Sequence, residues 1–499
     1  MKFLCYALIG IMSGQCCYAD PAEHDHPVPE KLGTVSFPIS CGAASEKEFE
    51  HAVALLHSFA YSAAEHAFRA LTAKNPNCAM LHWGVAMNYY HPLWEPHLTP
   101  QTAEQGRHEL DEAKRLGGSE RERGFIDALD HLYGPTTTEA SAPYKQRAEA
   151  YQKSMAALAE HNPNDVECQV FYALALLGTA APTDRTHANE KKAVSVLGPL
   201  FQKYPEHPGI AHYLIHACDN SEMATRGLPA ARLYSQIAPS APHALHMPSH
   251  IHTRLGLWED SIASNRAARN AAHQQGDIGE ELHAMDYLTY AYLQLGRDEE
   301  AENVLKDISK LPALQAGEFK VGYAASAMPV RYAIERRQWK DAARLAAIPG
   351  AQPQVTAVTS WARAVGHARS GDSAAARQEI EKLKRAREQL QSAGEEYWGN
   401  QVVVEIDEAL SWAAFSEKKN DEAIQLMRKA ADEEDAVEKR PVTPGAIVPA
   451  REQLGDLLLQ IGRPKDALPE FDTALRLTPN RRGSIQGKKQ ALELVAAKN

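Results

Sequence analysis

The sequence predicts an all-α solenoid of stacked helix-turn-helix repeats. At 499 residues the chain is long for one ordinary core, whereas a stacked array can grow to this size. Hydrophobic residues make up 44% and aromatic residues only 7%, and alanine and leucine are abundant, which favours helices. From Ser45 onward no alternating pattern long enough for useful strands interrupts the helical periodicity.

The clearest repeat lies near the C-terminus. Gly455 falls in its first helix and Gly462 at its turn, while Ala467 and Phe471 fall in its second helix, which ends at Pro479. Small residues allow two helices to cross closely, an aromatic ring fills the gap between repeats, and proline stops a helix. Weaker copies are marked by Tyr61, Gly256, Gly296, Trp339, Gly371 and Asp421.

This spacing resembles the repeat of about 34 residues in tetratricopeptide-repeat (TPR) proteins, and the resemblance covers most of the chain. The strings LLHSFAYSAAEHAFRA, CAMLHWGVAMNYYHPLW, HPGIAHYLIH and HALHMPSHIHTRLG also resemble an exported bacterial TPR family of undefined function. The resemblance implies a right-handed superhelix and an exported location. It implies no substrate and no catalytic residues.

The N-terminus predicts export. Lys2 precedes an apolar run that is too short to span a bilayer, and Ala19 suits signal-peptidase cleavage. We divide the chain into a signal peptide (1–19), an irregular segment (20–44), the repeat array (45–480) and a C-terminal capping helix (481–499). We expect a periplasmic or secreted protein with no membrane span. The net charge of −11, with no basic stripe, argues against nucleic-acid binding.

Four cysteines remain after cleavage: Cys41, Cys78, Cys168 and Cys218. In an oxidising compartment they can form two disulfides, and Cys41 with Cys78 is the first pair to test. Buried free thiols are the alternative. No CxxC spacing occurs, so a cysteine-rich zinc module is not expected.

The histidines are concentrated in one part of the chain. Nine of the 22 lie between His207 and His283. Aligned on the turn glycine Gly256, the pair His246 and His250 takes the same repeat positions as His212 and His216 one repeat earlier. Residues four apart share a helix face, and packed helices lie about 8–10 Å apart. The two HxxxH pairs can therefore converge on one point of the inner face.

We therefore expect a metal site there, with four first-choice ligands: His212, His216, His246 and His250. Three residues are candidates for a further ligand, a second metal or a supporting position: His243, His283 and Asp286. Asp219 could also orient a ligand. Imidazole without thiolate suits copper or iron at least as well as zinc. No HExxH motif occurs, so the familiar zinc-protease helix is absent.

The same inner face is expected to hold a peptide or a small molecule, with Arg254, Tyr290 and Arg331 facing the groove. Two functions stay open. One is a metal-dependent enzyme whose catalytic residues are unknown, and the other is a non-enzymatic scaffold that binds a partner's peptide. Purely structural histidines are a further alternative. Fold alone does not decide between them.

Overall fold

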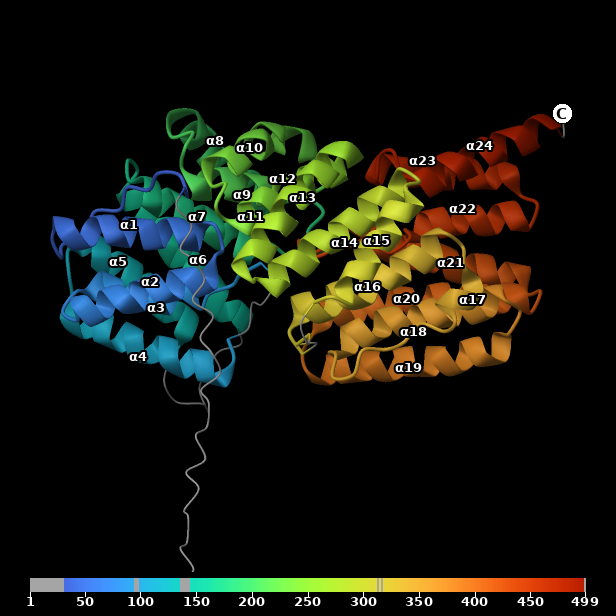
Figure 1. The fold of residues 1–499 in the computed structure, drawn as a ribbon, viewed down its shortest axis with the longest axis horizontal. Helices are drawn as coiled ribbons and strands as arrows, with labels where there is room; N and C mark the ends of the chain where they lie inside the picture. Colours follow the sequence, from blue (N-terminus) through green and yellow to red (C-terminus); the bar gives the residue numbers. More distant parts are fainter. Residues whose placement is uncertain (1–30, 94–97, 135–143, 312–313, 316, 498–499) are drawn as a thin grey trace, which may run out of the picture.

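The computed structural model describes residues 31–93, 98–134, 144–311, 314–315 and 317–497, and its elements are helices (Figure 1). They are α1 (Ala43–His57), α2 (Tyr61–Lys74), α3 (Ala79–Asn88), α4 (Pro100–Leu116), α5 (Glu120–Tyr133), α6 (Tyr144–His161), α7 (Val166–Gly178), α8 (Ala188–Lys203), α9 (Pro208–Cys218), α10 (Ala224–Ile237), α11 (Pro242–His246), α12 (Pro248–Arg254), α13 (Trp258–Gln275), α14 (Ile278–Gln294), α15 (Asp298–Ile308), α16 (Phe319–Glu335), α17 (Trp339–Ala342), α18 (Pro353–Arg369), α19 (Ser373–Ser392), α20 (Glu396–Ser416), α21 (Asn420–Asp435), α22 (Ala450–Gln460), α23 (Pro464–Leu477) and α24 (Arg482–Ala497). The predicted signal peptide lies outside the described residues.

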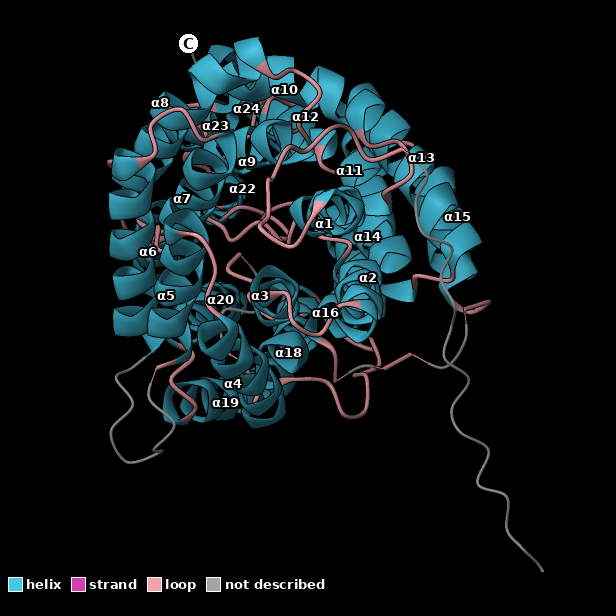
Figure 2. Cartoon of the chain, turned by 90° about the vertical axis from the view of Figure 1, so that its left-hand side faces the viewer, coloured by secondary structure: helices cyan, strands magenta, loops and turns pink. Residues whose placement is uncertain are grey.

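The helices stack in sequence order. Each packs mainly against the helices next to it along the chain, which is the contact pattern of a solenoid. Seen from one end, the outer helices form a curved wall, and helices such as α1 and α3 lie inside it together with loops (Figure 2). The predicted all-α solenoid of TPR-type repeats is confirmed.

Small residues lie where the helices cross. A Cβ atom added to Gly455 of α22 would come within 2.7 Å of the Phe471 ring, and one added to Gly487 of α24 within 2.3 Å of the same ring. The turn glycines Gly256 and Gly462 have φ angles of 66° and 81°, the left-handed region that favours glycine. The spacing in the sequence therefore reflects steric requirements of the repeat.

The last repeat returns to the middle of the array. The Trp258 indole of α13 donates a hydrogen bond to the Asn480 carbonyl oxygen at 2.9 Å. The buried Arg481 donates to the Tyr290 hydroxyl of α14 at 3.1 Å and forms ion pairs with Glu335 and Glu452. These contacts connect the C-terminal helices to the middle of the chain, so the solenoid curls back on itself.

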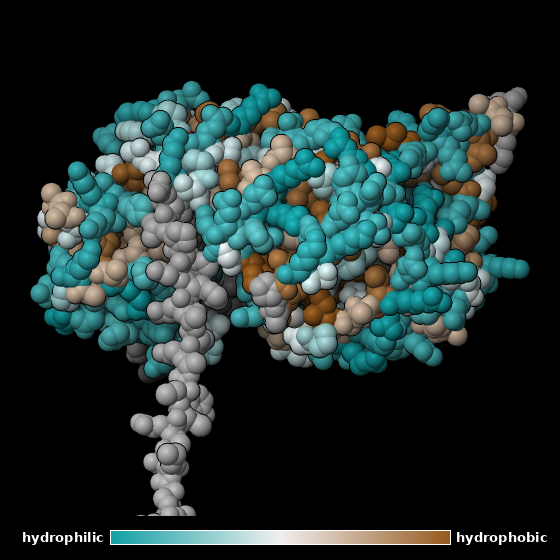
Figure 3. All heavy atoms as spheres, viewed as in Figure 1, coloured by the Kyte–Doolittle hydropathy of each residue, from teal (hydrophilic) through white to brown (hydrophobic). Residues whose placement is uncertain are grey.

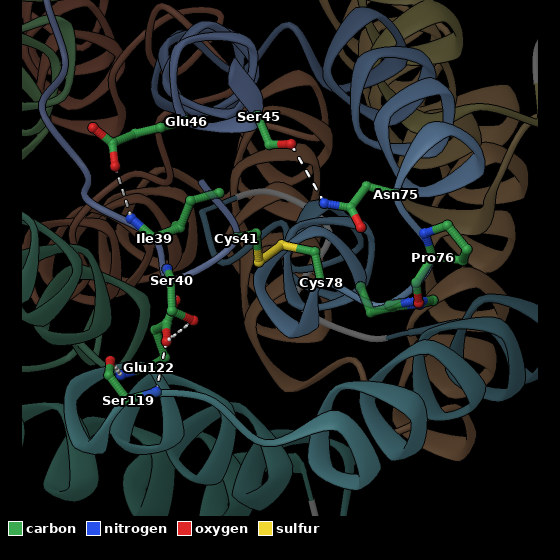
Figure 4. The surroundings of a disulfide bond; sticks show 11 residues. Ile39, Ser40, Cys41, Ser45, Glu46, Asn75, Pro76, Cys78, Ser119 and Glu122 are labelled. Carbon is green, nitrogen blue, oxygen red and sulfur yellow. Dashed lines mark hydrogen bonds between the residues drawn. A yellow bond between two sulfur atoms is a disulfide. The ribbon is translucent and has the colours of Figure 1, made fainter. Parts of the chain in front are cut away.

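The segment before α1 is extended and runs from the residues beside α8 and α10, where Thr34 N–H donates to the Glu206 carbonyl oxygen, to the first helices, where Phe37 packs against Phe49 and Trp83. Four of its apolar side chains are buried: Leu32, Val35, Phe37 and Ile39. It ends in a disulfide between Cys41 and Cys78 at the start of α3, with Cα atoms 5.5 Å apart (Figure 4). The disulfide joins the pair that the sequence marked as the first to test, whereas Cys168 and Cys218 are buried free thiols, the alternative that the sequence left open.

The face in Figure 3 is mostly hydrophilic, with hydrophobic residues showing in scattered places. Among the helices of the described residues, none combines the length and the apolar character needed to cross a membrane.

Candidate metal centre

Buried histidines from four helices gather in two groups on the inner face. We name them the first triad (His212, His216 and His243) and the second triad (His246, His250 and His283). Within each triad, one nitrogen from every ring lies within 4.8 Å of the other two. The triads adjoin each other, since the His216 and His250 ring centroids are 5.8 Å apart. All six side chains are buried.

The repeat register predicted the contacts within each helix. The Nε2 atoms of His212 and His216 lie 3.0 Å apart on α9, and those of His246 and His250 lie 3.0 Å apart across the α11–α12 junction. The four first-choice residues do not form one set, however. Each HxxxH pair is completed by a third histidine, from α11 or from α14.

The hydrogen bonds fix where the protons lie in the second triad. His246 Nδ1 is 2.6 Å from Asn265 Oδ1, and the Asn265 amide nitrogen donates to the Ser261 carbonyl oxygen at 2.8 Å. The Asn265 oxygen must therefore accept from His246. His250 Nδ1 is 2.9 Å from Asp219 Oδ2, so it donates to that carboxylate.

Two lone pairs consequently face each other. Because both Nδ1 atoms carry the proton, a neutral His246 and a neutral His250 have only lone pairs on their Nε2 atoms. These atoms are 3.0 Å apart, and as long as both rings are neutral no hydrogen lies between them. A cation resolves this contact. A metal ion about 2 Å from each nitrogen matches the separation, with Nδ1 donating to a carboxylate or carbonyl in the usual way.

The surroundings keep these rings neutral. Burial lowers the pKa of His246 well below its ordinary value, and neighbouring His283 and His250 lower it further. Burial also lowers the pKa of His250, although Asp219 opposes the shift. Burial alone would raise the pKa of Asp219, but Lys439 and Arg254 hold it well below its usual range. The carboxylate therefore stays ionised as an acceptor.

In the first triad, the hydrogen bonds fix the positions of the protons less completely. His212 Nδ1 donates to the His57 carbonyl oxygen at 2.6 Å, which leaves a lone pair on its Nε2 atom when the ring is neutral. His216 Nε2 can donate to that atom, in which case the buried His216 Nδ1 atom has no hydrogen-bond partner among the described residues. His243 Nδ1 lies 3.4 Å from Glu280 Oε2.

A third set of buried residues, the Glu167 group, consists of His57, Glu167 and His207. The Glu167 oxygens accept from His57 Nε2 at 2.9 Å and from His207 Nε2 at 2.8 Å. The other ring nitrogens accept from the Tyr213 hydroxyl and from the Ile210 backbone N–H. Burial raises the Glu167 pKa, but His207 and His57 outweigh it and bring the pKa to about 2. This network is complete without a metal.

A loop from the C-terminal half lies against the second triad. Lys439, in the 436–449 loop between α21 and α22, donates to Asp219 Oδ2 at 2.9 Å. Tyr287 donates to the carbonyl oxygens of Pro441 and Thr443, and its ring lies 4.6 Å from that of His246. Segments far apart in the sequence therefore build the site together.

Asp286 stands apart from both triads. Its carboxylate pairs with the buried Arg331 at 3.1 Å. Arg331 also donates to the carbonyl oxygens of Gly445 and Ala446 in the 436–449 loop. Arg331 thus holds the loop, and Asp286 pairs with Arg331 and belongs to neither triad.

The other two expected groove residues are also engaged within the chain. Arg254 donates to Asp219 at 2.8 Å and pairs with Glu438 of the 436–449 loop. The Tyr290 hydroxyl accepts from Arg481. Because the solenoid curls back and this loop enters its interior, the chain itself occupies places where a partner's peptide was expected.

A cavity of about 240 Å³ adjoins both triads. Histidines from each triad line it, with Phe59, Glu280 and Lys320 among the other lining residues. Its histidine lining consists of His216 and His243 from the first triad, His250 and His283 from the second, and His91. A small molecule that enters this cavity can therefore meet both sets of ring nitrogens.

Sequence reasoning found the histidines and Asp219 but missed other supporting groups. Asn265 lies on α13, a helix that carries none of the triad histidines, and Lys439 is far along the chain. No local pattern marks either of them. His57 could have been noticed, because it lies in one of the strings that carry the family resemblance, LLHSFAYSAAEHAFRA.

No family model matches the chain, and no curated protein matches it. Solved repeat structures do match. The P58(IPK) TPR domain is 13% identical with a TM-score of 0.22, covering 92% of this chain and 99% of that one. The APC/C hetero-tetramer Cut9-Hcn1 is 13% identical with a TM-score of 0.36, covering 92% and 79%. The human IFIT1 dimer with m7Gppp-AAAA is 13% identical with a TM-score of 0.37, covering 84% and 90%.

Proposed function

We propose that this chain is a metal-binding TPR-type protein whose ligands are the buried histidines of the two triads. The facing Nε2 atoms of His246 and His250 carry the proposal. Their Nδ1 protons are committed to Asn265 and Asp219, so the 3.0 Å contact lacks a hydrogen. Imidazole ligands without thiolate suit copper, iron or zinc.

The site has the features of an open metal centre. Three protein ligands leave at least one coordination position for water or substrate, as in catalytic rather than structural sites. The adjoining cavity of about 240 Å³ suits a small molecule better than a peptide. A metal-dependent enzyme acting on a small molecule is therefore the function that the site supports best.

The alternative, a scaffold holding a partner's peptide on its inner face, has weaker support. The three residues expected to contact such a peptide are Arg254, Tyr290 and Arg331. Each is bound to other residues of the chain, and the 436–449 loop holds two of them. A peptide in this place would have to displace those contacts.

We also propose that the protein is exported. The Cys41–Cys78 disulfide supports this location, because such bonds persist mainly in oxidising compartments. The predicted cleavage site after Ala19 is tested by sequencing the N-terminus of the protein recovered from the periplasm or the medium. An intact Met1 would contradict export by this signal.

Metal binding is tested on the mature chain from Asp20, first freed of metal and then loaded separately with copper, zinc or iron. After dialysis, elemental analysis is expected to find metal bound in stoichiometric amount. The double variant His246→Gln/His250→Gln is expected to lose the metal of the second triad. The matched control His66→Gln/His273→Gln changes two exposed histidines and should keep the full content. A wild-type chain that binds none of these metals would refute the proposal.

A further inference from the structure

The two triads are close enough to act together. Besides the His216–His250 contact at 5.8 Å, the His243 and His246 ring centroids are 6.1 Å apart across the boundary. His243 and His246 lie on the same short helix, α11, although they belong to different triads. A single rigid element therefore connects the two sets of ligands.

Both triads border the same cavity. Two rings from each triad line the cavity of about 240 Å³. Three imidazoles leave at least one coordination position on a four-coordinate ion. One small ligand in the cavity can therefore reach an ion in each triad at the same time.

The local charges favour an anionic ligand. Imidazole ligands bring no negative charge to the site. The nearby carboxylate of Asp219 is already paired with Arg254 and Lys439, and that of Glu280 with Lys320. Two metal ions would therefore keep most of their positive charge uncompensated in a buried place, which is costly. An ion of low charge, such as Cu(I), or an anion from the cavity reduces this cost.

We propose that the two triads form one two-copper centre, which in its Cu(II) state binds a small external anion between the two ions. Among the metals that imidazole ligands suit, copper is favoured because its monovalent state, Cu(I), brings less uncompensated charge into this buried site than a divalent ion does. This inference rests on the proposed metal binding, but it adds the number of ions, their identity and the class of ligand.

The experiment uses the full mature chain loaded with Cu(II) and dialysed, with azide as the anion. Elemental analysis is expected to find two copper ions per chain. Azide should produce a new charge-transfer absorption band. It should also remove most of the copper paramagnetic resonance signal, because a bridging anion couples the two unpaired spins.

Single-residue variants separate the two ions. His243→Gln and His283→Gln are each expected to retain one copper, whose resonance signal azide leaves in place. The matched control His273→Gln alters an exposed histidine on α13 and should keep two coupled ions. Circular dichroism checks that each variant is folded, and the azide measurement on the wild type needs no variant.

The outcomes distinguish failure of the two-copper proposal from failure of the proposed metal binding. One copper per chain, lost equally in both variants, would overturn the pair and leave metal binding intact. Two copper ions whose signals azide does not diminish would overturn the shared ligand. A chain that takes up no metal at all would overturn both proposals.

Discussion

The second triad and the Glu167 group are both buried and rich in histidine, yet their ring nitrogens differ in their hydrogen-bond partners. In the Glu167 group, a carboxylate lies between two rings, and each of the four ring nitrogens has a complementary partner. In the second triad, the Nδ1 atoms of His246 and His250 donate to Asn265 and Asp219. The Nε2 atoms of the two neutral rings then face each other without a proton between them.

The difference suggests a criterion for separating a structural histidine cluster from a candidate metal site. Clustering alone does not decide, because both sets bring three potential ligands within 4.8 Å. What decides is whether hydrogen bonds within the protein use every nitrogen. In the Glu167 group, hydrogen bonds use all four ring nitrogens. In the second triad, the Nε2 atoms of His246 and His250 have no such partner, and a bound cation would satisfy both of them.

The largest expected effect is on copper affinity, when one histidine of the second triad is replaced and compared with a replaced histidine of the Glu167 group. His250→Gln should abolish copper binding at the second triad, lowering its affinity by more than about 100-fold, since even losing a supporting partner costs about 10–100-fold. His207→Gln should keep the wild-type copper content. Competition with a copper chelator measures both. Loss of copper in His207→Gln, with retention in His250→Gln, would reverse the assignment.

The Glu167 group should instead contribute to stability. Glu167→Gln removes the charge that both rings contact and places an amide N–H against one of them. Breaking a buried pair in this way costs about 3 kcal/mol in the free energy of unfolding. Urea denaturation of the metal-free protein measures it. Copper content should stay unchanged, and an unfolding free energy equal to that of the wild type would show that the network is dispensable.

The sequence predicted the repeats well because their rules are local. Gly455, Gly462 and Phe471 are required by contacts within one helix pair, so their spacing is visible in the chain. The two HxxxH pairs were visible for the same reason. The Cys41–Cys78 disulfide was predicted as the first pair to test, although the sequence left free thiols as an alternative.

The grouping of the ligands could not be read from the sequence. It depends on how sharply the solenoid curls and on a break at Met247–Pro248 that separates α11 from α12. The same curl brings the 436–449 loop against Tyr287 and Arg331. Because these contacts join residues more than a hundred positions apart, no local pattern marks them.

A smaller loss of copper affinity is expected when the hydrogen-bond partner of a proposed ligand is removed. Asn265→Ala takes away the acceptor of the His246 Nδ1 proton, and copper affinity at the second triad should fall by about 10-fold. Asn270→Ala, an exposed asparagine on the same helix, is the matched control. Chelator competition at constant pH compares the two. Equal affinities in both variants would show that Asn265 does not hold the ring for metal.

The smallest effect concerns the response of the Glu167 group to acid. The Glu167 pKa is about 2 in the folded chain against an ordinary 4.5, so folding favours the ionised form. Its contribution is therefore complete above about pH 4.5 and is lost as the pH falls towards 2, by at most about 1.4 kcal/mol per pH unit. The difference in unfolding free energy between metal-free wild type and Glu167→Gln should stay constant from pH 7 to 5 and shrink at pH 4 and 3. A difference that persists undiminished at pH 3 would show that the carboxylate is not held ionised by His57 and His207, and the contrast with the second triad would lose its physical basis.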